Sequence, residues 1–574
     1  MNDEKLMRMR HSFAHLLGAA VKELYPDAKI ATGPAIDNGF YYDFDFTTPI
    51  TDKDLGKIEQ KMRELSKKVK SFDKAEISNK DAEKLFKGNP YKLELIKEYT
   101  KEGQTLTTYT SGDFVDLCAG PHVESMDEIK NAAFKLERIA GAYWKGSEKN
   151  KMLTRVYGLA FESKEKLNDY LKLLEEARKR DHKKIGKELE LFMFHETAPG
   201  MPYWLTKGLI IYNELVNYWR VKHNSLNYQE ISSPLVNKSD LWKISGHWEH
   251  YKDDMFIADM GENEVYGIKP MNCPNAMLVY KSKPRSYRDF PIRLSDTDRL
   301  HRYERSGTLN GLLRCRSFQQ DDSHNFVTED TIGSEYESIF EICKEFYGIF
   351  NLEYSFRLGT RPESFLGDKE TWDKAEKVLK EILEKSKKKY VVAEGDGAFY
   401  GPKIDIIMKD ALGRDWQMGT IQLDFQLPRR FELEYNDKDG KRKTPIVIHR
   451  VIYGSLERFL GVYIEHCEGN FPLWLAPVQI KIVPIRENHN EHAEKVAQEL
   501  KDAGFRVDCD TNEGNMGGKV RDAKNNKVPY TIIIGDKDIE AKKISVESRD
   551  KGQLGQMDLK EFIKKIVKEK EEKK

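Results

Sequence analysis

The stretch HRYERSGTLNGLLRCRSFQQDDSH, residues 301–324, carries the strongest indication of the fold. It joins an Arg-x-Glu at Arg302 to a polar loop, and two more arginines then precede Phe318. The flanking segments read as strands without a regular strand–helix alternation, which favours a mostly antiparallel sheet surrounded by helices. Because a guanidinium is planar and permanently charged, such arginines suit bidentate contacts with phosphate or carboxylate groups.

Length and composition limit the class of protein. A chain of 574 residues is too long for one core and predicts roughly three or four domains. Basic and acidic residues number 95 each, so any polyanionic partner has to be met by local basic patches. No apolar run has the length of a membrane span, and no signal-peptide pattern is present. The 6 cysteines are widely spread without a Cys-x-x-Cys pair, which favours a reducing cytoplasm.

Changes in local composition and in the pattern of expected strands and helices divide the chain into four parts. Residues 1–162 mix alternating segments with Lys/Glu-rich helices, which predicts a compact α+β domain. Residues 163–189 read as one charged linker helix. Residues 190–475 hold most of the aromatic residues and Gly/Pro-punctuated strands, and residues 476–574 alternate strand and helix as a small α/β domain does.

Two histidines lie four residues apart near the start of the chain, in RHSFAHLLGAAVKELYP, residues 10–26. The apolar residues of this segment recur at helical spacing, so we expect an amphipathic helix that carries His11 and His15 on one face. The pair could bind a metal, serve proton transfer or substrate binding, or be an ordinary pair of satisfied side chains. The segment alone leaves these alternatives open.

Three motifs occur in the order and spacing of the class II aminoacyl-tRNA synthetases. NYQEISSPLV (residues 227–236), the stretch at 301–324 and GSLERF (454–459) resemble motifs 1, 2 and 3 of that class. Further segments resemble the threonyl-tRNA synthetases, namely KPMNCP (269–274), QDDSH (320–324), QMGTIQLDF (417–425), HSFAHLL (11–17), GFYYDFDF (39–46) and GDFVDLCAGPHV (112–123). The resemblance covers nearly the whole chain.

The resemblance implies a multidomain α+β protein. It has an editing domain at 1–162, a linker helix at 163–189, a class II catalytic domain with an antiparallel sheet at 190–475, and an α/β anticodon-binding domain at 476–574. The implied reaction is ATP-dependent ligation of L-threonine to threonine tRNA through threonyl-adenylate, with hydrolysis of mischarged seryl-tRNA. Because the editing motif begins at residue 11, the likeness is to the bacterial type without the small ubiquitin-like N-terminal domain. A cytoplasmic homodimer without membrane contact is expected.

The resemblance also implies roles for single residues. Arg302 would act on the α-phosphate and the carboxylate during catalysis. The ATP-binding residues would be Arg302, Glu304, Arg314, Phe318, Gln417, Thr420, Gln422 and Arg458, together with Mg²⁺. The threonine-binding residues would be Gln320, Asp322 and Tyr400. One Zn²⁺ would be bound by Cys273, His324 and His449, a ligand set that leaves a coordination position open.

The same resemblance assigns the editing site to His11, His15, Cys118 and His122, with Lys92 and Asp116 in support and Tyr42 nearby. The spacing HxxxH…CxxxH also reads as four zinc ligands, whereas the family implies hydrolysis without a metal, and both interpretations stay open. Asn512 and Arg549 are the candidate anticodon contacts. Two departures from the family pattern are Ala119 in CAGPH and Glu547 in VESR.

Three rival functions remain. The chain could be a paralogue that binds tRNA without activating an amino acid, but such proteins typically lose motif arginines or zinc ligands. It could serve another class II amino acid such as serine or proline, against which the Cys-His-His set argues. It could also act only as the editing hydrolase, which the complete central domain disfavours.

Overall fold

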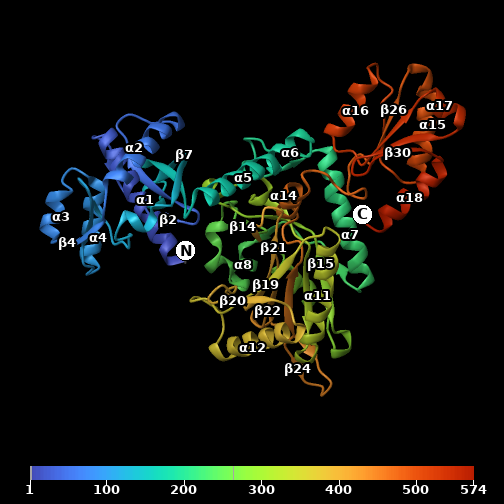
Figure 1. Ribbon diagram of the computed structural model, residues 1–574. Helices are drawn as coiled ribbons and strands as arrows, with labels where there is room; N and C mark the ends of the chain where they lie inside the picture. The colour runs from blue at the N-terminus through green and yellow to red at the C-terminus, as the bar shows by residue number, and fades with distance from the viewer. Residues whose placement is uncertain (1–2, 263, 574) are drawn as a thin grey trace. The chain divides into compact units, whose positions relative to one another are not determined.

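The computed structural model describes residues 3–262 and 264–573, which divide into one compact unit that ends at Glu176 and another that begins at Ala177. Figure 1 shows the course of the chain through both units. Among the described residues, no helix combines the length and the hydropathy that crossing a membrane requires.

The first unit is an α+β domain, as expected. Its helices are α1 (Asp3–Leu24), α2 (Leu55–Lys68), α3 (Asn79–Leu85) and α4 (Pro90–Lys101). Its strands are β1 (Lys29–Ile30), β2 (Ala35–Ile36), β3 (Gly39–Asp45), β4 (Asp73–Glu76), β5 (Thr107–Ser111), β6 (Phe114–Leu117), β7 (Ala133–Tyr143) and β8 (Met152–Phe161). They form an antiparallel sheet in the order β1-β3-β8-β7, with β2 on β3, and a second sheet β4-β5-β6.

Helix α1 confirms the helix predicted from the apolar spacing. Phe13, Leu16, Leu17 and Ala20 are buried on one side of it. This side contacts β3 and α2, so the hydrophobic effect fixes the rotation of α1 about its own axis. The rotation carries His15 into the interior along with the apolar residues.

The linker differs from the single helix that was expected. Helix α5 (Lys164–Arg180) ends before Asp181, and a separate helix α6 (His182–Glu188) begins after it. The Asp181 side chain accepts a hydrogen bond from the backbone N–H of Lys183 and so caps α6. Composition does not reveal this break, because the charged periodicity runs on through the cap.

The second unit is built on an eight-stranded sheet in the order β11-β15-β18-β25-β22-β21-β19-β20. Only the end pairs β11–β15 and β19–β20 are parallel, which confirms the antiparallel expectation. The strands are β11 (Gln229–Glu230), β15 (Ile292–Asp296), β18 (Asp322–Val327), β19 (Tyr354–Gly359), β20 (Tyr390–Ala393), β21 (Lys403–Lys409), β22 (Asp415–Asp424) and β25 (Ile446–Val451).

Helices surround this sheet (Figure 1). They are α7 (Thr206–Ser225), α8 (Ser239–Ser245), α9 (His247–His250), α10 (Cys273–Lys281), α11 (Ile332–Gly348), α12 (Lys369–Ser386), α13 (Leu427–Arg430) and α14 (Leu456–Cys467). Short pairs complete it: β9 (Phe192–Met193) with β10 (Tyr203–Trp204), β14 (Val265–Ile268) with β12 (Val236–Lys238) and β13 (Ile257–Asp259), β16 (Arg299–His301) with β17 (Ser317–Gln319), and β23 (Tyr435–Asn436) with β24 (Arg442–Lys443). The main core lies between the sheet, α7, α11 and α14, where Trp219, Tyr347 and Phe459 are buried.

The C-terminal part of this unit is an α/β fold, as the predicted alternation of strands and helices indicated. Its sheet has the order β27-β26-β28-β29-β30, parallel on both sides of β26 and antiparallel beyond β28. The strands are β26 (Ile480–Pro484), β27 (Val507–Cys509), β28 (Tyr530–Ile534), β29 (Ile544–Ser548) and β30 (Gly552–Met557). The helices are α15 (Asn490–Asp502), α16 (Met516–Asn525), α17 (Asp536–Ala541) and α18 (Leu559–Glu571).

The turn that leads from β25 into α14 requires glycine. Gly454 has a φ of +77°, and a Cβ at this position would lie 2.1 Å from the carbonyl oxygen of Met418. Ser455 follows as the N-cap of α14 and accepts a hydrogen bond from the backbone N–H of Arg458. The turn and the cap together fix where α14 starts and where its first turn points.

We expect Gly454→Ala to lower the free energy of unfolding of the second unit by about 2–5 kcal/mol, because strain of the left-handed backbone adds to the collision with Met418. Calorimetry of the full chain measures the change. Gly440→Ala is the matched control, since Gly440 also has a φ of +77° but no atom within 4 Å of the added Cβ. Equal losses in the two variants would contradict the role assigned to the close approach.

Candidate functional site

A cavity of about 370 Å³ opens on the large sheet of the second unit and collects most of the residues singled out in the sequence. Its lining includes all of the expected ATP, threonine and zinc residues: Cys273, Arg302, Glu304, Arg314, Phe318, Gln320, Asp322, His324, Tyr400, Gln417, Thr420, Gln422, His449 and Arg458. These residues come from segments nearly two hundred positions apart, so the fold brings them together.

The hairpin of β16 and β17 holds one side of the cavity. Its register pairs Leu300 with Phe318, and Arg302 follows directly after β16. The Arg302 guanidinium lies 5.1 Å from the centre of the Phe318 ring, and its Nε donates to the carbonyl of Pro270 at 3.3 Å. A flat apolar ring and a fixed cation therefore lie next to each other at the cavity wall.

Glu304 and Arg314 form an ion pair within the motif 2 loop. Arg314 donates from Nε to a carboxylate oxygen of Glu304 at 2.9 Å. The Glu304 carboxylate was expected to contact the base of a nucleotide and the Arg314 guanidinium its outer phosphates. In the structure the two groups bind each other instead. Both residues can take those roles only when this pair separates. This ion pair could not be predicted from the sequence, because no local pattern relates two side chains ten positions apart in a loop.

The start of α14 supplies a third arginine of the cavity, Arg458. Arg458 donates from Nε to the carbonyl of Leu313 at 2.9 Å and from Nη1 to the carbonyl of Gln417 at 3.3 Å. Backbone carbonyls position the guanidinium without neutralising its charge. It therefore stays available to an anionic ligand.

Residues of β22 face the same cavity and share a buried carboxylate. Gln417 Nε2 and Thr420 Oγ1 both donate to Oδ1 of Asp405, at 2.8 and 2.9 Å. Tyr400 donates its hydroxyl to Gln422. Asp405 is fully buried and was not recognised from the sequence, although it fixes the orientation of two expected site residues.

Cys273, His324 and His449 form a buried cluster. One ligand atom from each lies within 4.8 Å of the others, although the three residues are far apart in the sequence. Register explains the meeting of the two histidines, since β18 and β25 pair His324 directly with His449. Cys273 is the first residue of α10, and burial raises the pKa of its thiol well above the ordinary value, so a thiolate there requires a bound cation.

The cluster fits a bound metal ion. His324 is buried and its Nδ1 has no hydrogen-bond partner, a costly arrangement that a ligand would relieve. Burial also lowers the pKa of His324 well below its ordinary value, which keeps the imidazole neutral as ligation requires. His449 is hydrogen-bonded through Nε2 to Asp424 at 2.8 Å, in the manner of carboxylates that orient metal-bound histidines.

Asp322, the first residue of β18, lies two positions before His324 and so on the same face of the strand. Its Oδ2 accepts a hydrogen bond from the amide of Asn272 at 3.1 Å. Burial raises the pKa of Asp322 to about 6. An ammonium group brought beside it would favour the ionised form and be bound in turn. Asn272 and Asp424, the orienting partners here, lie inside quoted motifs but carried no assigned role.

A second polar cluster lies in the first unit. Cys118 Sγ is 3.4 Å from His11 Nε2 and 3.3 Å from His122 Nε2, and the rings of His11 and His122 stack at 4.1 Å. Ligand atoms of these three residues lie within 4.8 Å of one another, and His15 is outside this group. His15 instead packs edge-on against the ring of His122 at 5.1 Å.

Burial keeps this cluster uncharged. It lowers the pKa of His15 to about 4 and that of His122 to about 2, and it raises the pKa of Cys118 to about 11. Ser12, which sequence reasoning missed, lies 3.3 Å from Nδ1 of His122. At neutral pH the imidazoles are therefore neutral and can hydrogen-bond a water molecule, and the thiol stays protonated.

A buried ion pair borders the cluster. Lys92 Nζ lies 2.6 Å from Asp116, and Tyr42 donates its hydroxyl to the same carboxylate at 2.5 Å. Lys92 also donates to the carbonyl of Leu117 at 3.3 Å, next to Cys118. Lys92 and Asp116, the two groups predicted to support the site, therefore contact each other directly, and Tyr42 joins them through Asp116.

The two anticodon candidates differ in their surroundings. Asn512 is exposed, before α16. Arg549 is engaged: Nη1 donates to the carbonyls of Phe471 and Lys527, and Nε donates to Asp550 at 2.8 Å. These contacts hold the loop after β29 against neighbouring segments and leave the guanidinium little freedom to contact a base.

Comparisons with known proteins identify three families of domain along the chain. The tRNA synthetase class II core domain (G, H, P, S and T) matches residues 256–467, an anticodon binding domain matches 479–569, and the threonyl and alanyl tRNA synthetase second additional domain matches 106–157. The crystal structure of the RNA binding domain of threonyl-tRNA synthetase from Cryptosporidium parvum Iowa II is 41% identical, with a TM-score of 0.66, over 68% of this chain and 98% of that one.

Curated relatives extend the similarity to nearly the full length. The threonine--tRNA ligase of Clostridium tetani is 49% identical over 98% of this chain and 88% of its own. That of Caldanaerobacter subterraneus is 50% identical over 97% and 86%. The chain therefore belongs to the threonine--tRNA ligase family of class II aminoacyl-tRNA synthetases.

Proposed function

We propose that this protein activates L-threonine with ATP, transfers it to threonine tRNA, and hydrolyses seryl-tRNA formed in error. The observation that carries the proposal is the buried Cys273–His324–His449 cluster inside the cavity that also holds the motif arginines. A paralogue without activation chemistry would not need this combination. Membership of the family supports the same reaction.

Activation needs positioning and charge neutralisation more than covalent chemistry. Arg302 would clamp the α-phosphate and the threonine carboxylate, so that the carboxylate attacks phosphorus and pyrophosphate leaves. Phe318 would stack on the adenine ring. Arg314 and Arg458 would bind the outer phosphates with Mg²⁺, and Glu304, released from Arg314, would accept the adenine amino group. Gln417, Thr420 and Gln422 complete the nucleoside side of the site.

Cys273, His324 and His449 would hold one Zn²⁺ in the threonine pocket. When bound, the ion supplies a Lewis acid for the amino and hydroxyl groups of threonine, which valine cannot match. Asp322, positioned by Asn272, would face the amino group, with Gln320 and Tyr400 beside it. Asp424 would hold the imidazole of His449 in the orientation that ligation requires.

Serine has the same ligating groups as threonine and lacks only a methyl group. Such a difference is worth about 1–3 kcal/mol in binding, too little for accurate translation. A second, hydrolytic site is therefore needed. We assign it to the cluster of His11, His15, Cys118 and His122, with Lys92 and Asp116 holding the substrate.

We favour hydrolysis at this second site without a metal. A four-ligand zinc site would need His15 among the ligands, and His15 lies outside the group of converging ligand atoms. His15 is also buried, so its imidazole is better suited to orient His122 and a water molecule than to bind an ion. A three-ligand site at His11, Cys118 and His122 is the alternative that metal analysis of the protein would reveal.

The remaining assignments concern the whole assembly. We propose an editing domain at 1–162, a linker at 163–189, a catalytic domain at 190–475 and an anticodon-binding domain at 476–574. Asn512 remains the preferred anticodon contact, and the engaged guanidinium of Arg549 favours a role in holding the domain together. A cytoplasmic homodimer is the expected state, as motif 1 typically implies.

Arg302→Ala should lower threonine-dependent ATP–pyrophosphate exchange by roughly 100-fold or more, because the charge developing at the α-phosphate loses its fixed partner. Unfolding temperature and seryl-tRNA hydrolysis should be unchanged. The control is Arg288→Ala, which removes an exposed arginine that is not among the residues lining the cavity. Exchange within a few-fold of the unmodified protein would remove Arg302 from the mechanism.

Cys273→Ser, His324→Ala and His449→Ala should each reduce zinc from about one ion per chain to a small fraction, because a three-ligand site rarely survives with two ligands. Elemental analysis after gel filtration measures this directly. Cys509→Ser, in the C-terminal sheet, should retain zinc in full. Absence of zinc from the unmodified protein, with full exchange in the presence of a chelator, would refute the assignment.

The double variant His11→Ala with His15→Ala should hydrolyse seryl-tRNA roughly 100-fold more slowly while charging threonine normally, since the two sites belong to separate units. His11→Ala alone, at a half-buried position, should change hydrolysis in the same direction. Glu23→Ala, at the exposed end of the same helix, serves as the control. Full hydrolysis by the double variant would disprove the assignment.

A further inference from the structure

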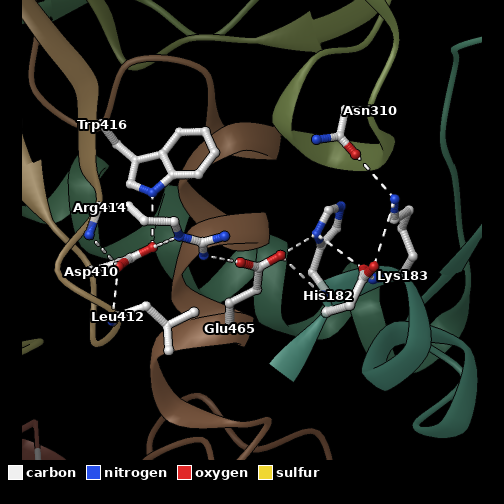
Figure 2. A network of polar contacts seen from close by, with 9 residues as sticks. His182, Lys183, Asn310, Asp410, Leu412, Arg414, Trp416 and Glu465 are labelled. Carbon is white, nitrogen blue, oxygen red and sulfur yellow. Dashed lines mark hydrogen bonds and ion pairs between the residues drawn. The ribbon is translucent and has the colours of Figure 1, made fainter. Parts of the chain in front are cut away.

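A buried polar network outside both sites joins three parts of the second unit: the start of α6, the last turn of α14 and the turn between β21 and β22 (Figure 2). At its centre is the pair of His182 and Glu465, of which His182 is fully buried. Nothing in the proposed chemistry uses these residues. A buried histidine paired with a carboxylate at the end of a linker therefore needs its own explanation.

On the Nδ1 side of His182, the network consists of charged side chains. His182 Nδ1 lies 2.8 Å from Glu465 Oε1, and the other oxygen of Glu465 is paired with Arg414. Arg414 is held in turn by Asp410 at 2.6 Å, and the indole of Trp416 donates to the same carboxylate at 2.9 Å. Burial raises the pKa of Glu465, but the hydrogen bonds from His182 and Arg414 outweigh it and lower the pKa overall. Glu465 is thus an ionised acceptor.

The other side of His182 reaches the motif 2 loop. Its Nε2 accepts a hydrogen bond from the backbone N–H of Leu312 at 3.1 Å, within the 3-10 turn Gly311–Leu313. With Nδ1–H donated to Glu465 and Nε2 accepting, both nitrogens are used and one neutral tautomer is selected. Asp181, His182 and Glu465 also lie close enough to share a metal ion, but these partners already occupy the imidazole and the Glu465 carboxylate.

Glycine makes the close approach possible. A Cβ on Gly311 would lie 2.3 Å from His182 Nε2, and the φ of Gly311 is +53°. Gly461 of α14 similarly leaves room, since a Cβ there would lie 3.2 Å from Cβ of Leu312. The turn is therefore packed closely against α6 and α14, with the imidazole as its polar anchor.

The anchored turn leads directly into the nucleotide residues. The carbonyl of Leu313 accepts the hydrogen bond from Arg458 Nε at 2.9 Å, and Arg314 is the next residue. A shift of the turn therefore displaces both arginines that would bind the outer phosphates. His182 itself lies outside the lining of the cavity, so it can act on a nucleotide only indirectly, through the residues that it holds in place.

We propose that His182 is a positioning residue for ATP: it anchors the turn Gly311–Leu313 and thereby sets Arg314 and Arg458 for the outer phosphates. The inference rests on the proposed function of the cavity. Loss of the anchor leaves the N–H of Leu312 buried without a partner and frees the turn to move. The expected consequence is a higher KM for ATP, with threonine recognition and seryl-tRNA hydrolysis retained.

Two substitutions, each of which can keep only one of the two hydrogen bonds of the His182 imidazole, test the positioning role. In His182→Asn the amide can donate to Glu465 but is too short to reach Leu312, whereas in His182→Gln the amide oxygen can extend to the position of Nε2 and accept from Leu312. We expect His182→Asn to raise the KM for ATP at least tenfold in pyrophosphate exchange, with the KM for threonine within twofold. His182→Gln should restore most of the ATP affinity. A purely structural role would lower activity without this split.

Controls separate folding from positioning. Lys183→Ala removes a neighbouring contact, from Nζ to Oδ1 of Asn310 at 3.1 Å, that is exposed and should change the KM for ATP less than twofold. Gly311→Ala pushes the turn from the opposite side and should reproduce the effect of His182→Asn. The unfolding temperature, measured on every variant, identifies any protein that has misfolded, and seryl-tRNA hydrolysis checks that the first unit is unaffected.

The outcomes distinguish this inference from the proposed function. No threonine-dependent exchange in the unmodified protein would refute the function itself. Normal exchange there, with an unchanged KM for ATP in a folded His182→Asn variant, would overturn the positioning role alone. Nitrogen NMR of the imidazole gives a readout besides activity: Nδ1 should carry the proton and Nε2 should not, and the reverse tautomer would also overturn the proposal.

Discussion

The pairing of β18 with β25 is the constraint on which the synthetic site depends. Its register sets His324 opposite His449, and the next pairing, of β25 with β22, sets Gln422 opposite His449. A slip of one residue would turn these side chains to the other face of the sheet. The register is held by the core on that other face, where Val327, Ile448 and Leu423 are buried. Hydrophobic packing on one side thus determines polar geometry on the other.

Around this sheet, backbone groups do much of the positioning of charged side chains. The Arg458 guanidinium is held by the carbonyls of Leu313 and Gln417, and the buried Asp321 accepts from the N–H groups of Ile452 and Gly454. Contacts of this kind orient a side chain without cancelling the charge of a cation. An arginine fixed in this way keeps its attraction for phosphate, unlike Arg314, which is paired with Glu304.

The two clusters of histidine and cysteine show how burial can suit similar residues to different chemistry. At Cys273, an unpartnered nitrogen of His324 and the carboxylate of Asp424 beside His449 fit a metal ion. At Cys118, His11 and His122 contact each other, Ser12 and a backbone carbonyl, whereas among the described residues Nε2 of the buried His15 has no hydrogen-bond partner and no carboxylate orients the imidazoles. The donor types are alike, and the surrounding partners make the difference.

Much of the architecture could be predicted from the sequence, because apolar periodicity and motif order are local properties. The helix that carries His11 and His15, the antiparallel sheet and the C-terminal α/β fold were all expected and are present. The break at Asp181 was missed, since a cap needs one side-chain hydrogen bond that composition does not reveal. The orienting roles of Asn272, Asp405 and Asp424 were missed for a similar reason: each depends on a partner distant in sequence.

The sequence by itself determined the family, the order of the domains and the residue types at each site. Only the tertiary structure decided which of those side chains meet, which are already paired and which stay available, as the Glu304–Arg314 pair, the engaged Arg549 and the His182 anchor illustrate. The physical reason is that a hydrogen bond or an ion pair acts over about 3 Å of space, whatever the separation along the chain.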